Sequence, residues 1–351
     1  MVIPMLLFRR FISVVVLVLM VGLFTHCREP GPAAPPAIPE QRVQDIPLTG
    51  PIDDPSAEVS GLAWYGDHLI LLPQYPNFPE TTGGGRLFTI PKADILAYLD
   101  DRSRGPLQPD TIVFVAPDLN PRVAKFEGYE AIVFDGEQAY LTIEDDPPSP
   151  DVTGSYLVAG TIAQDLSAFT VETTDLLKGK INTQSGVENM AEETLLLTGG
   201  RILTIHEANG PTVNDAPVAH VFDRQREPIR TIPFPPIPYR ITDATALDSA
   251  GHFWTINYMF FRDIDLRTHQ DPFFKQFGEG PTHAKTERVE RLVEFQLTRD
   301  SIALTGAAPI QLALLPNASR NWEGIVRLDD RGFLLITDEH PETLLAFVPK
   351  P

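Results

Sequence analysis

Five similar apolar runs in this sequence each begin with a residue whose side chain offers an oxygen ligand. These residues are Ser60, Glu130, Glu188, Asp243 and Glu323. Oxygen donors without Cys or clustered His suit a hard cation, and an irregular oxygen cage suits Ca²⁺ better than Mg²⁺. The pattern therefore predicts a Ca²⁺ site built from these side chains. The alternative is that each residue hydrogen-bonds to nearby backbone amides, as turn carboxylates often do.

Each apolar run is followed by a turn and by a second apolar run that ends in a polar residue. The polar residues are Gln74, Glu144, Glu207, Asn257 and Asp338. A carboxylate beside a bound substrate can take a proton from attacking water. Glu144, Glu207 and Asp338 are therefore the candidate catalytic residues.

Three arginines are candidates for contact with an anionic ligand. Arg240 and Arg320 come just before the fourth and fifth of the apolar runs, and Arg262 lies in a long insertion over residues 258–290. Guanidinium groups bind phosphate oxygens well, but they pair equally well with carboxylates. The sequence leaves both interpretations of Arg240 and Arg320 open.

The elements that must position these residues are short β-strands. Turns at residues 134–136 and 198–200 are typical of those that join two such runs into a hairpin. Further strand-like runs follow in each unit, but the fifth unit lacks one, and residues 42–48 can supply it beside residues 344–348. The sequence thus predicts an all-β fold, a β-propeller of five four-stranded blades closed by an N-terminal strand. A β-sandwich, two β domains or a sixth, degenerate blade are the alternatives.

The predicted fold brings the polar residues together. In a propeller the first strand of each blade lines the axis, and the second strand runs antiparallel beside it. The residue that begins the first strand and the residue that ends the second therefore lie at the same mouth of the central channel. Carboxylates that converge there repel one another unless a cation or shared protons neutralise them.

The first 27 residues resemble the signal segment of a bacterial lipoprotein. Arg9 and Arg10 precede an uncharged apolar stretch over residues 11–24, which is short for a transmembrane helix of about 20 residues. Cys27 follows this stretch and is expected to be acylated, with an uncleaved helix as the alternative. Residues 28–41 form a Pro-rich linker, and residues 42–351 form the propeller domain. We expect a lipoprotein anchored in a bacterial cell envelope and facing the periplasm or the exterior.

The composition excludes several classes of protein. Lys and Arg total 28 against 47 Asp and Glu, which gives a net charge of −19. Nucleic-acid binding requires a positive surface, so a nucleic-acid partner is not expected. A single Cys excludes both a disulfide framework within the chain and a thiolate zinc cluster. We expect a monomer.

Two of the blade openings carry a resemblance to known families. The sequences Tyr-Glu-Ala-Ile at 129–132 and Trp-Glu-Gly-Ile at 322–325, with acid pairs at 144–145 and 338–339, resemble the calcium-activated nucleotidases (apyrases). They are also similar to the phytase-like and SdiA-regulated extracellular propellers. The resemblance implies a five-bladed propeller with Ca²⁺ held in its channel by Ser and Glu side chains. The nucleotidases carry an Arg in the first blade where this chain has Gln-Tyr-Pro at 74–76.

Two functions are compatible with these features. The first is Ca²⁺-dependent hydrolysis of a phosphoester or phosphoanhydride, with a small phosphorylated substrate. The second is a non-catalytic envelope protein that binds a ligand or another protein on the same face. The sequence contains no Gly-x-Ser-x-Gly elbow, His-Glu-x-x-His helix or Gly-Lys-Ser/Thr phosphate loop. The absence of a complete catalytic set favours the non-catalytic protein, whereas the crowded polar mouth of the channel favours the enzyme.

Overall fold

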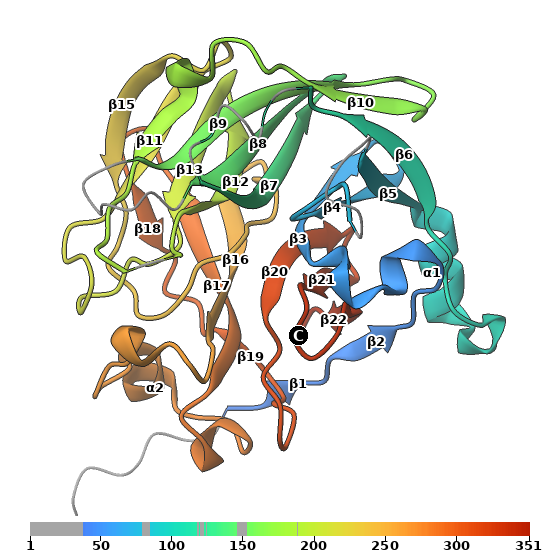
Figure 1. Ribbon diagram of the computed structural model, residues 1–351. Coiled ribbons are helices and arrows are strands. Elements are labelled where there is room, and N and C mark those ends of the chain that lie inside the picture. Colours follow the sequence, from blue (N-terminus) through green and yellow to red (C-terminus); the bar gives the residue numbers. More distant parts are fainter. Residues whose placement is uncertain are drawn as a thin grey trace, which may run out of the picture. The chain divides into compact units, whose positions relative to one another are not determined.

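The computed structural model describes residues 38–78, 85–117, 119, 123, 125–145, 153–187 and 189–351. Cys27, the predicted signal segment and most of the predicted linker lie outside these residues. No helix among the described residues is long and apolar enough to cross a membrane. The described chain is a β-propeller with five blades, which confirms the predicted fold class (Figure 1).

The first two blades are joined into one sheet. Blade 1 contains β3 (Val59–Tyr65), β4 (His68–Pro73), β5 (Gly85–Pro91) and β6 (Asp110–Val115). Blade 2 contains β7 (Phe126–Asp135), β8 (Gln138–Asp145), β9 (Thr153–Ile162) and β10 (Ala168–Val171), with β11 (Lys180–Asn182) paired to β9. The two outermost strands, β6 and β10, pair in parallel, so the outer edges of these blades are covered by each other.

Blade 3 is a four-stranded antiparallel sheet of consecutive strands. It contains β12 (Glu192–Thr198), β13 (Arg201–His206), β14 (Val218–Asp223) and β15 (Pro228–Pro233). Its first strand therefore begins at Glu192, and the prediction that residues 187–190 open this blade is wrong by several residues.

Blade 4 departs most from the predicted pattern. It contains β16 (His252–Met259), β17 (Val289–Leu297), β18 (Ile302–Leu304) and β19 (Ile310–Leu312), and β1 (Glu40–Gln41) pairs in parallel with β19. The segment around Asp243, predicted to form the inner strand of this blade, makes isolated bridges instead, from Arg240 to Tyr258 and from Ala244 to Thr255.

Blade 5 closes the ring as the sequence predicts. It contains β20 (Trp322–Leu328), β21 (Gly332–Thr337), β22 (Leu345–Pro349) and the N-terminal strand β2 (Gln44–Ile46). β2 pairs antiparallel with β22, with Asp45 opposite Ala346, which confirms the closing strand. An N-terminal strand beside the C-terminal one leaves no open end in the circle of blades.

Helices are few and short in the described chain. The α-helices are α1 (Lys92–Asp100), which follows β5, and α2 (Pro272–Phe277) in the long insertion. The 3₁₀ helices are Pro51–Asp53, Pro55–Ala57, Arg102–Arg104, Leu176–Gly179, Ile264–Leu266 and His283–Lys285.

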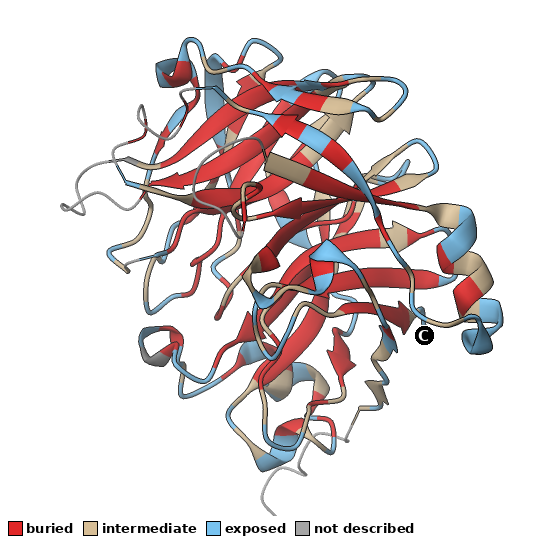
Figure 2. Ribbon diagram, turned by 45° about the vertical axis from the view of Figure 1, so that its right-hand side comes forward, coloured by how far each residue is buried: buried red, intermediate tan, exposed pale blue. Residues whose placement is uncertain are grey.

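Five apolar clusters hold the blades together, one between each pair of neighbours. Strands that are covered on both faces have continuous apolar sequences. Figure 2 shows that most strands of the blades are largely buried. In β21, Leu334 and Ile336 face blade 1 while Phe333 and Leu335 face blade 4. Each such side chain contributes about 1.5–3 kcal/mol through burial. The innermost strands consequently pack against one another around the axis.

Candidate functional site: an acidic cavity where the blades converge

Blades 1, 2, 3 and 5 each have a β-bulge near the start of the inner strand. The bulge turns one side chain away from the paired strands. The cross-strand register skips a position at each bulge. The residues without a direct partner there include Ser60, Glu130, Glu193 and Glu323. Bulges re-aim side chains in this way and are frequent beside functional sites.

These four residues line one cavity of about 240 Å³, which we call the mouth cavity. Residues from every blade contribute to its lining, so it lies on the axis where the blades converge. Its acidic lining includes five residues that we call the mouth acids: Glu130, Glu144, Glu193, Glu323 and Asp338. All except Asp338 are buried. Arg240 is the one basic residue among the described residues that line it.

Burial raises the pKa of all five mouth acids, and repulsion between carboxylates adds to the shift in all of them except Asp338. The pKa of Glu130 is raised to about 8, first by burial and then by the charges of Glu207, Asp338 and Glu127, against a 3.2 Å hydrogen bond from Gln74 Nε2. Burial, followed by neighbouring carboxylates, raises the pKa of Glu144, Glu193 and Glu323 well above the ordinary value. With a pKa of about 8, Glu130 holds a proton at neutral pH unless a cation neutralises it.

Arg240 is held rigidly at the edge of this acidic cavity. Its Nε and Nη2 donate to the two carboxylate oxygens of Asp263 at 2.8 and 2.9 Å, and its Nη1 donates to Glu207 Oε1 at 2.6 Å. The Tyr258 ring lies 5.8 Å below the guanidinium. Glu207 is thus engaged behind Arg240, although its Oε2 has no hydrogen-bond partner among the described residues.

Two neutral side chains connect the acids of blade 5. Asn321 Nδ2 donates to Asp338 Oδ2 at 2.6 Å, and the backbone N–H of His340 donates to Asp338 Oδ1 at 3.0 Å. The Tyr258 hydroxyl lies 2.9 Å from Glu323 Oε1 and also contacts Asn321. The Tyr258 hydroxyl can therefore donate to either Glu323 or Asn321.

Four of the described residues that were predicted for the site do not line the mouth cavity. Glu207 lies behind Arg240, and Asp243, Arg320 and Arg262 lie elsewhere. Asp243 does not line the cavity, because its oxygens accept hydrogen bonds from the backbone N–H groups of Ala244 (2.7 Å) and Ile325 (2.8 Å). Arg320 is buried and donates to Glu290 at 2.8 Å and to the carbonyl of Ala313 at 2.6 Å. Arg262 is exposed and stacks over Phe261 at 5.1 Å.

Glu188, the predicted ligand from the third blade, lies outside the described residues, and Glu193 occupies the position equivalent to the other bulge residues. A signal for Glu193 exists in the sequence. In four blades a turn residue with positive φ comes six positions after the bulge residue: Gly66 after Ser60, Gly136 after Glu130, Gly199 after Glu193 and Asp329 after Glu323. Counting back from the turn would have selected Glu193. The roles of Asn321 and Tyr258 had no comparable signal.

The donor set of the mouth cavity partly fits a hard cation. The atoms that could coordinate a cation are all oxygens, and Oε2 of Glu193 has no hydrogen-bond partner among the described residues. However, no three His, Cys, Asp or Glu side chains in the described chain are close enough together to hold a metal ion. A cation bound here as the side chains stand would be held by one or two carboxylates, with amide oxygens and water completing its shell.

Comparison with known proteins shows distant likenesses in structure. No family model and no curated protein sequence matches the chain. The catalytic domain of a Coprinopsis cinerea GH62 α-L-arabinofuranosidase aligns with a TM-score of 0.48 at 9% identity over 89% of this chain and 98% of its own. A Bombyx mori GH32 β-fructofuranosidase aligns with a TM-score of 0.47 at 7% identity over 88% of this chain and 61% of its own.

A luciferin-regenerating enzyme aligns with a TM-score of 0.43 at 8% identity over 88% of this chain and 95% of its own. Likenesses this distant say nothing about a reaction or a ligand. The comparisons also give no support to the resemblance to calcium-activated nucleotidases or phytase-like proteins. The propeller architecture rests on the strands of this chain and their pairing.

Proposed function

We propose that the mouth cavity binds a hard cation, with Ca²⁺ as the first candidate, and that the loaded site hydrolyses a phosphoester or phosphoanhydride. The observation that carries this proposal is the gathering of the mouth acids around a single guanidinium. Acids with strongly raised pKa values in a cavity are frequent at catalytic sites. The bound cation would supply charge neutralisation and polarisation of the phosphoryl oxygens.

The chain's own residues divide the remaining tasks. Arg240 would contact a phosphate oxygen, because Asp263 and Glu207 hold its guanidinium in one orientation at the cavity. Glu144 and Asp338 line the cavity and are the better candidates for accepting the proton of an attacking water. Glu207 is the weaker candidate, because Arg240 occupies one of its oxygens. Arg320 and Arg262 take no part in this arrangement.

The test of catalysis is an assay of the purified full chain in detergent against a panel of phosphoesters, with Ca²⁺ and with chelator. We expect turnover only with Ca²⁺. Glu144→Gln should lower it by about 10²–10⁴-fold, the usual contribution of general base catalysis. Glu137→Gln, which changes the same charge at an exposed position, is the matched control. Equal turnover in the two variants would exclude Glu144 as the base.

A second candidate function is favoured by the charge of the cavity. Eight acidic residues and one arginine line it, so the field at the empty site repels an anionic substrate. A non-catalytic domain that binds a cation or a cationic ligand would have the same lining. Ca²⁺ binding detected by calorimetry, without turnover of any phosphoester, would support this candidate over the hydrolase.

The proposed location outside the cytoplasm depends on Cys27. We propose that Cys27 is acylated and that the chain between it and β1 holds the propeller away from the membrane. Residues 40–41 of the predicted linker belong to the propeller instead, because they form β1 and pair with β19. Cys27→Ser should then move the protein from the membrane fraction to the soluble fraction or leave the precursor unprocessed. A variant that stays membrane-bound at the mature size would mean that an uncleaved helix is the anchor.

A further inference from the structure

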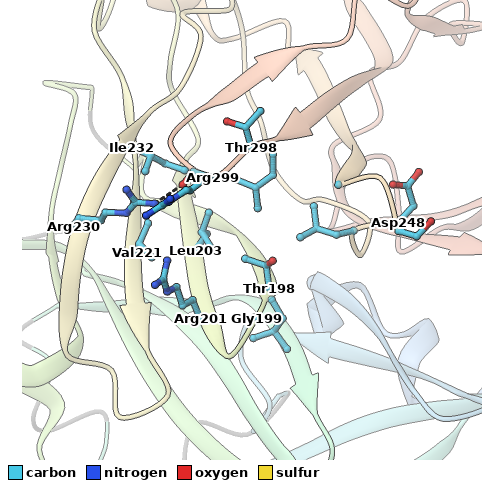
Figure 3. Close-up of a pocket in the computed structure, with 15 residues that line it drawn as sticks. Thr198, Gly199, Arg201, Leu203, Val221, Arg230, Ile232, Asp248, Thr298 and Arg299 are labelled. Carbon is cyan, nitrogen blue, oxygen red and sulfur yellow. Dashed lines mark hydrogen bonds between the residues drawn. The ribbon is translucent and has the colours of Figure 1, made fainter.

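A second and larger cavity, of about 480 Å³, lies between blades 3 and 4 (Figure 3). We call it the seam cavity. Its lining includes the turn at Thr198 and Gly199 that joins β12 to β13, the turn from Asp248 to Gly251 before β16, and the turn at Thr298 and Arg299 after β17.

The seam cavity is separate from the mouth cavity. Glu193, near the start of β12, lines the mouth cavity, whereas Thr198, at the end of the same strand, lines the seam cavity. Five residues of extended strand span about 17 Å, at about 3.4 Å per residue. Binding at the two cavities can therefore be tested independently, and this inference does not depend on the proposed function.

The irregular start of blade 4 contributes to the lining of the seam cavity. The segment before β16 forms isolated bridges instead of a continuous inner strand. Leu247, at the end of this segment, lines the cavity. Its floor is apolar, because Leu203, Val221 and Ile232 of blade 3 belong to the cluster packed between the two blades.

Three arginines surround this apolar floor, and Figure 3 shows them on one side of the cavity with Asp248 on the other. Arg230 donates to Asp300 at 2.8 Å and also to the carbonyl of Arg299. The guanidinium groups of Arg201 and Arg299 make no hydrogen bond or ion pair within the described part of the chain. Two cationic groups are thus available to a ligand.

The acid in the lining does not neutralise these groups. Asp248 Oδ1 accepts hydrogen bonds from the backbone N–H groups of Ala250 and His252, both at 2.8 Å, and its Oδ2 lies 3.5 Å from His252 Nδ1. The Asp248 carboxylate therefore interacts with groups of its own turn and not with the arginines. On a chain with a net charge of −19, a hollow lined by available arginines is locally complementary to an anion.

We propose that the seam cavity binds a small amphipathic anion, a molecule with one carboxylate, phosphate or sulfate group on an apolar body. The anionic group would take bidentate hydrogen bonds from Arg201 and Arg299. The apolar body would lie on Leu203, Val221 and Ile232. A cavity of about 480 Å³ has the size usual for drug-sized ligands.

The probe for this site is octanoate, titrated into the full chain in detergent and followed by calorimetry against a matched detergent blank. We expect Arg201→Gln and Arg299→Gln each to weaken octanoate binding by about tenfold, the effect of losing a charge-assisted hydrogen bond. Arg104→Gln is the matched control, because Arg104 is exposed and lies outside this cavity. Arg201 and Arg299 are also exposed, so both variants should keep the melting temperature of the parent.

Two further titrations separate the proposal from simpler explanations. Acetate carries the anionic group without the apolar body, and octylammonium carries the same tail with the opposite charge. Both should bind at least tenfold more weakly than octanoate. Octylammonium binding equal to that of octanoate would show an apolar surface without charge selection. Equal acetate binding would show an anion site without an apolar component, and either result overturns the proposal.

Discussion

Asp243 and Glu323 begin the inner segments of neighbouring blades and carry the same sequence signal, yet their carboxylates have different surroundings. Asp243 accepts two hydrogen bonds from backbone amides, one of them from Ile325 of blade 5, and so ties two blades together. Glu323 lines the mouth cavity, where its contacts include Tyr258 and other acids. Asp243 is therefore held by hydrogen bonds from backbone amides, whereas Glu323 faces a cavity that a ligand can enter.

The causes of their pKa shifts separate the two acids further. Burial raises the pKa of Asp243 against the opposing effect of backbone hydrogen bonds, and no other acid contributes. Burial also raises the pKa of Glu323, but the charges of Asp338 and Glu207 add to it. A cation in the mouth cavity should therefore act on Glu323 and leave Asp243 unaffected. The position in the repeat alone does not decide the role of an acid.

The largest expected effect is the loss of stability when Asp243 is removed. Asp243→Ala leaves the N–H groups of Ala244 and Ile325 without their acceptor, at about 1–3 kcal/mol each. We expect the free energy of unfolding, measured with denaturant, to fall by about 2–6 kcal/mol. Asp243→Asn, which keeps one acceptor oxygen, should lose about half as much. A loss within about 0.5 kcal/mol, as for an ordinary surface substitution, would contradict the structural role of Asp243.

The next effect concerns the response to Ca²⁺. If the mouth cavity binds Ca²⁺, free Ca²⁺ at 100 times its dissociation constant should stabilise the fold by about 2.7 kcal/mol. Chelator should lower the melting temperature accordingly, and Ca²⁺ should restore it better than Mg²⁺. Glu323→Gln should reduce this response, because it removes one charge from the cavity and keeps the shape.

Asp243→Asn is the matched control for the Ca²⁺ response. It removes the same charge one blade away, from a residue outside the cavity lining, and should leave the Ca²⁺ response intact. A melting temperature that is indifferent to chelator in the parent protein would remove the proposed cation site. An equal reduction in both variants would show that the response is not specific to the mouth cavity.

The comparison also shows which features the sequence can predict. Apolar runs and turns are local patterns, so the blades and the closing pair of β2 and β22 followed from them. The bulges that aim Glu130 and Glu323 into the cavity recur at the same distance from a turn, so these positions could be found as well.

Other features depend on contacts between distant parts of the chain. Arg320 bonds to Glu290, which is 30 residues away in the sequence, and Asp243 accepts a hydrogen bond from an amide that is 82 residues away. No local sequence pattern predicts that Arg320 contacts Glu290 or that Asp243 contacts the amide of Ile325. In blade 3, Glu188 matched the opening motif by residue type, but the turn at Gly199 sets the register of the strand and selects Glu193.

The smallest expected effect is a pH dependence through His283, which contacts Glu40. Like Asp243, Glu40 accepts several hydrogen bonds. Its carboxylate receives the side chain of His283 at 2.8 Å, the Thr282 hydroxyl at 2.7 Å and the backbone N–H groups of both residues at 2.9 and 3.0 Å. His283 Nε2 in turn accepts from the backbone N–H of Glu290 at 3.2 Å. His283 is therefore held as a neutral ring with its proton on Nδ1.

These contacts fix the sign of the pH effect. Burial lowers the pKa of His283, with Arg291 adding to the shift and Glu40 opposing it. The unfolded chain therefore binds the His283 proton more readily than the fold does, and stability is lost as the pH falls through the unfolded value of about 6.5. Burial raises the pKa of Glu40, but hydrogen bonds from His283 and Thr282 outweigh it and lower the pKa, so its contribution is lost further into acid.

We expect the free energy of unfolding to decrease by up to about 1.4 kcal/mol per pH unit just below pH 6.5 through His283. His283→Asn should flatten this slope, because it removes the titrating ring. His269→Asn is the matched control, since His269 is exposed and its substitution should leave the slope as it is in the parent. If the slope persisted in His283→Asn, another group would be responsible.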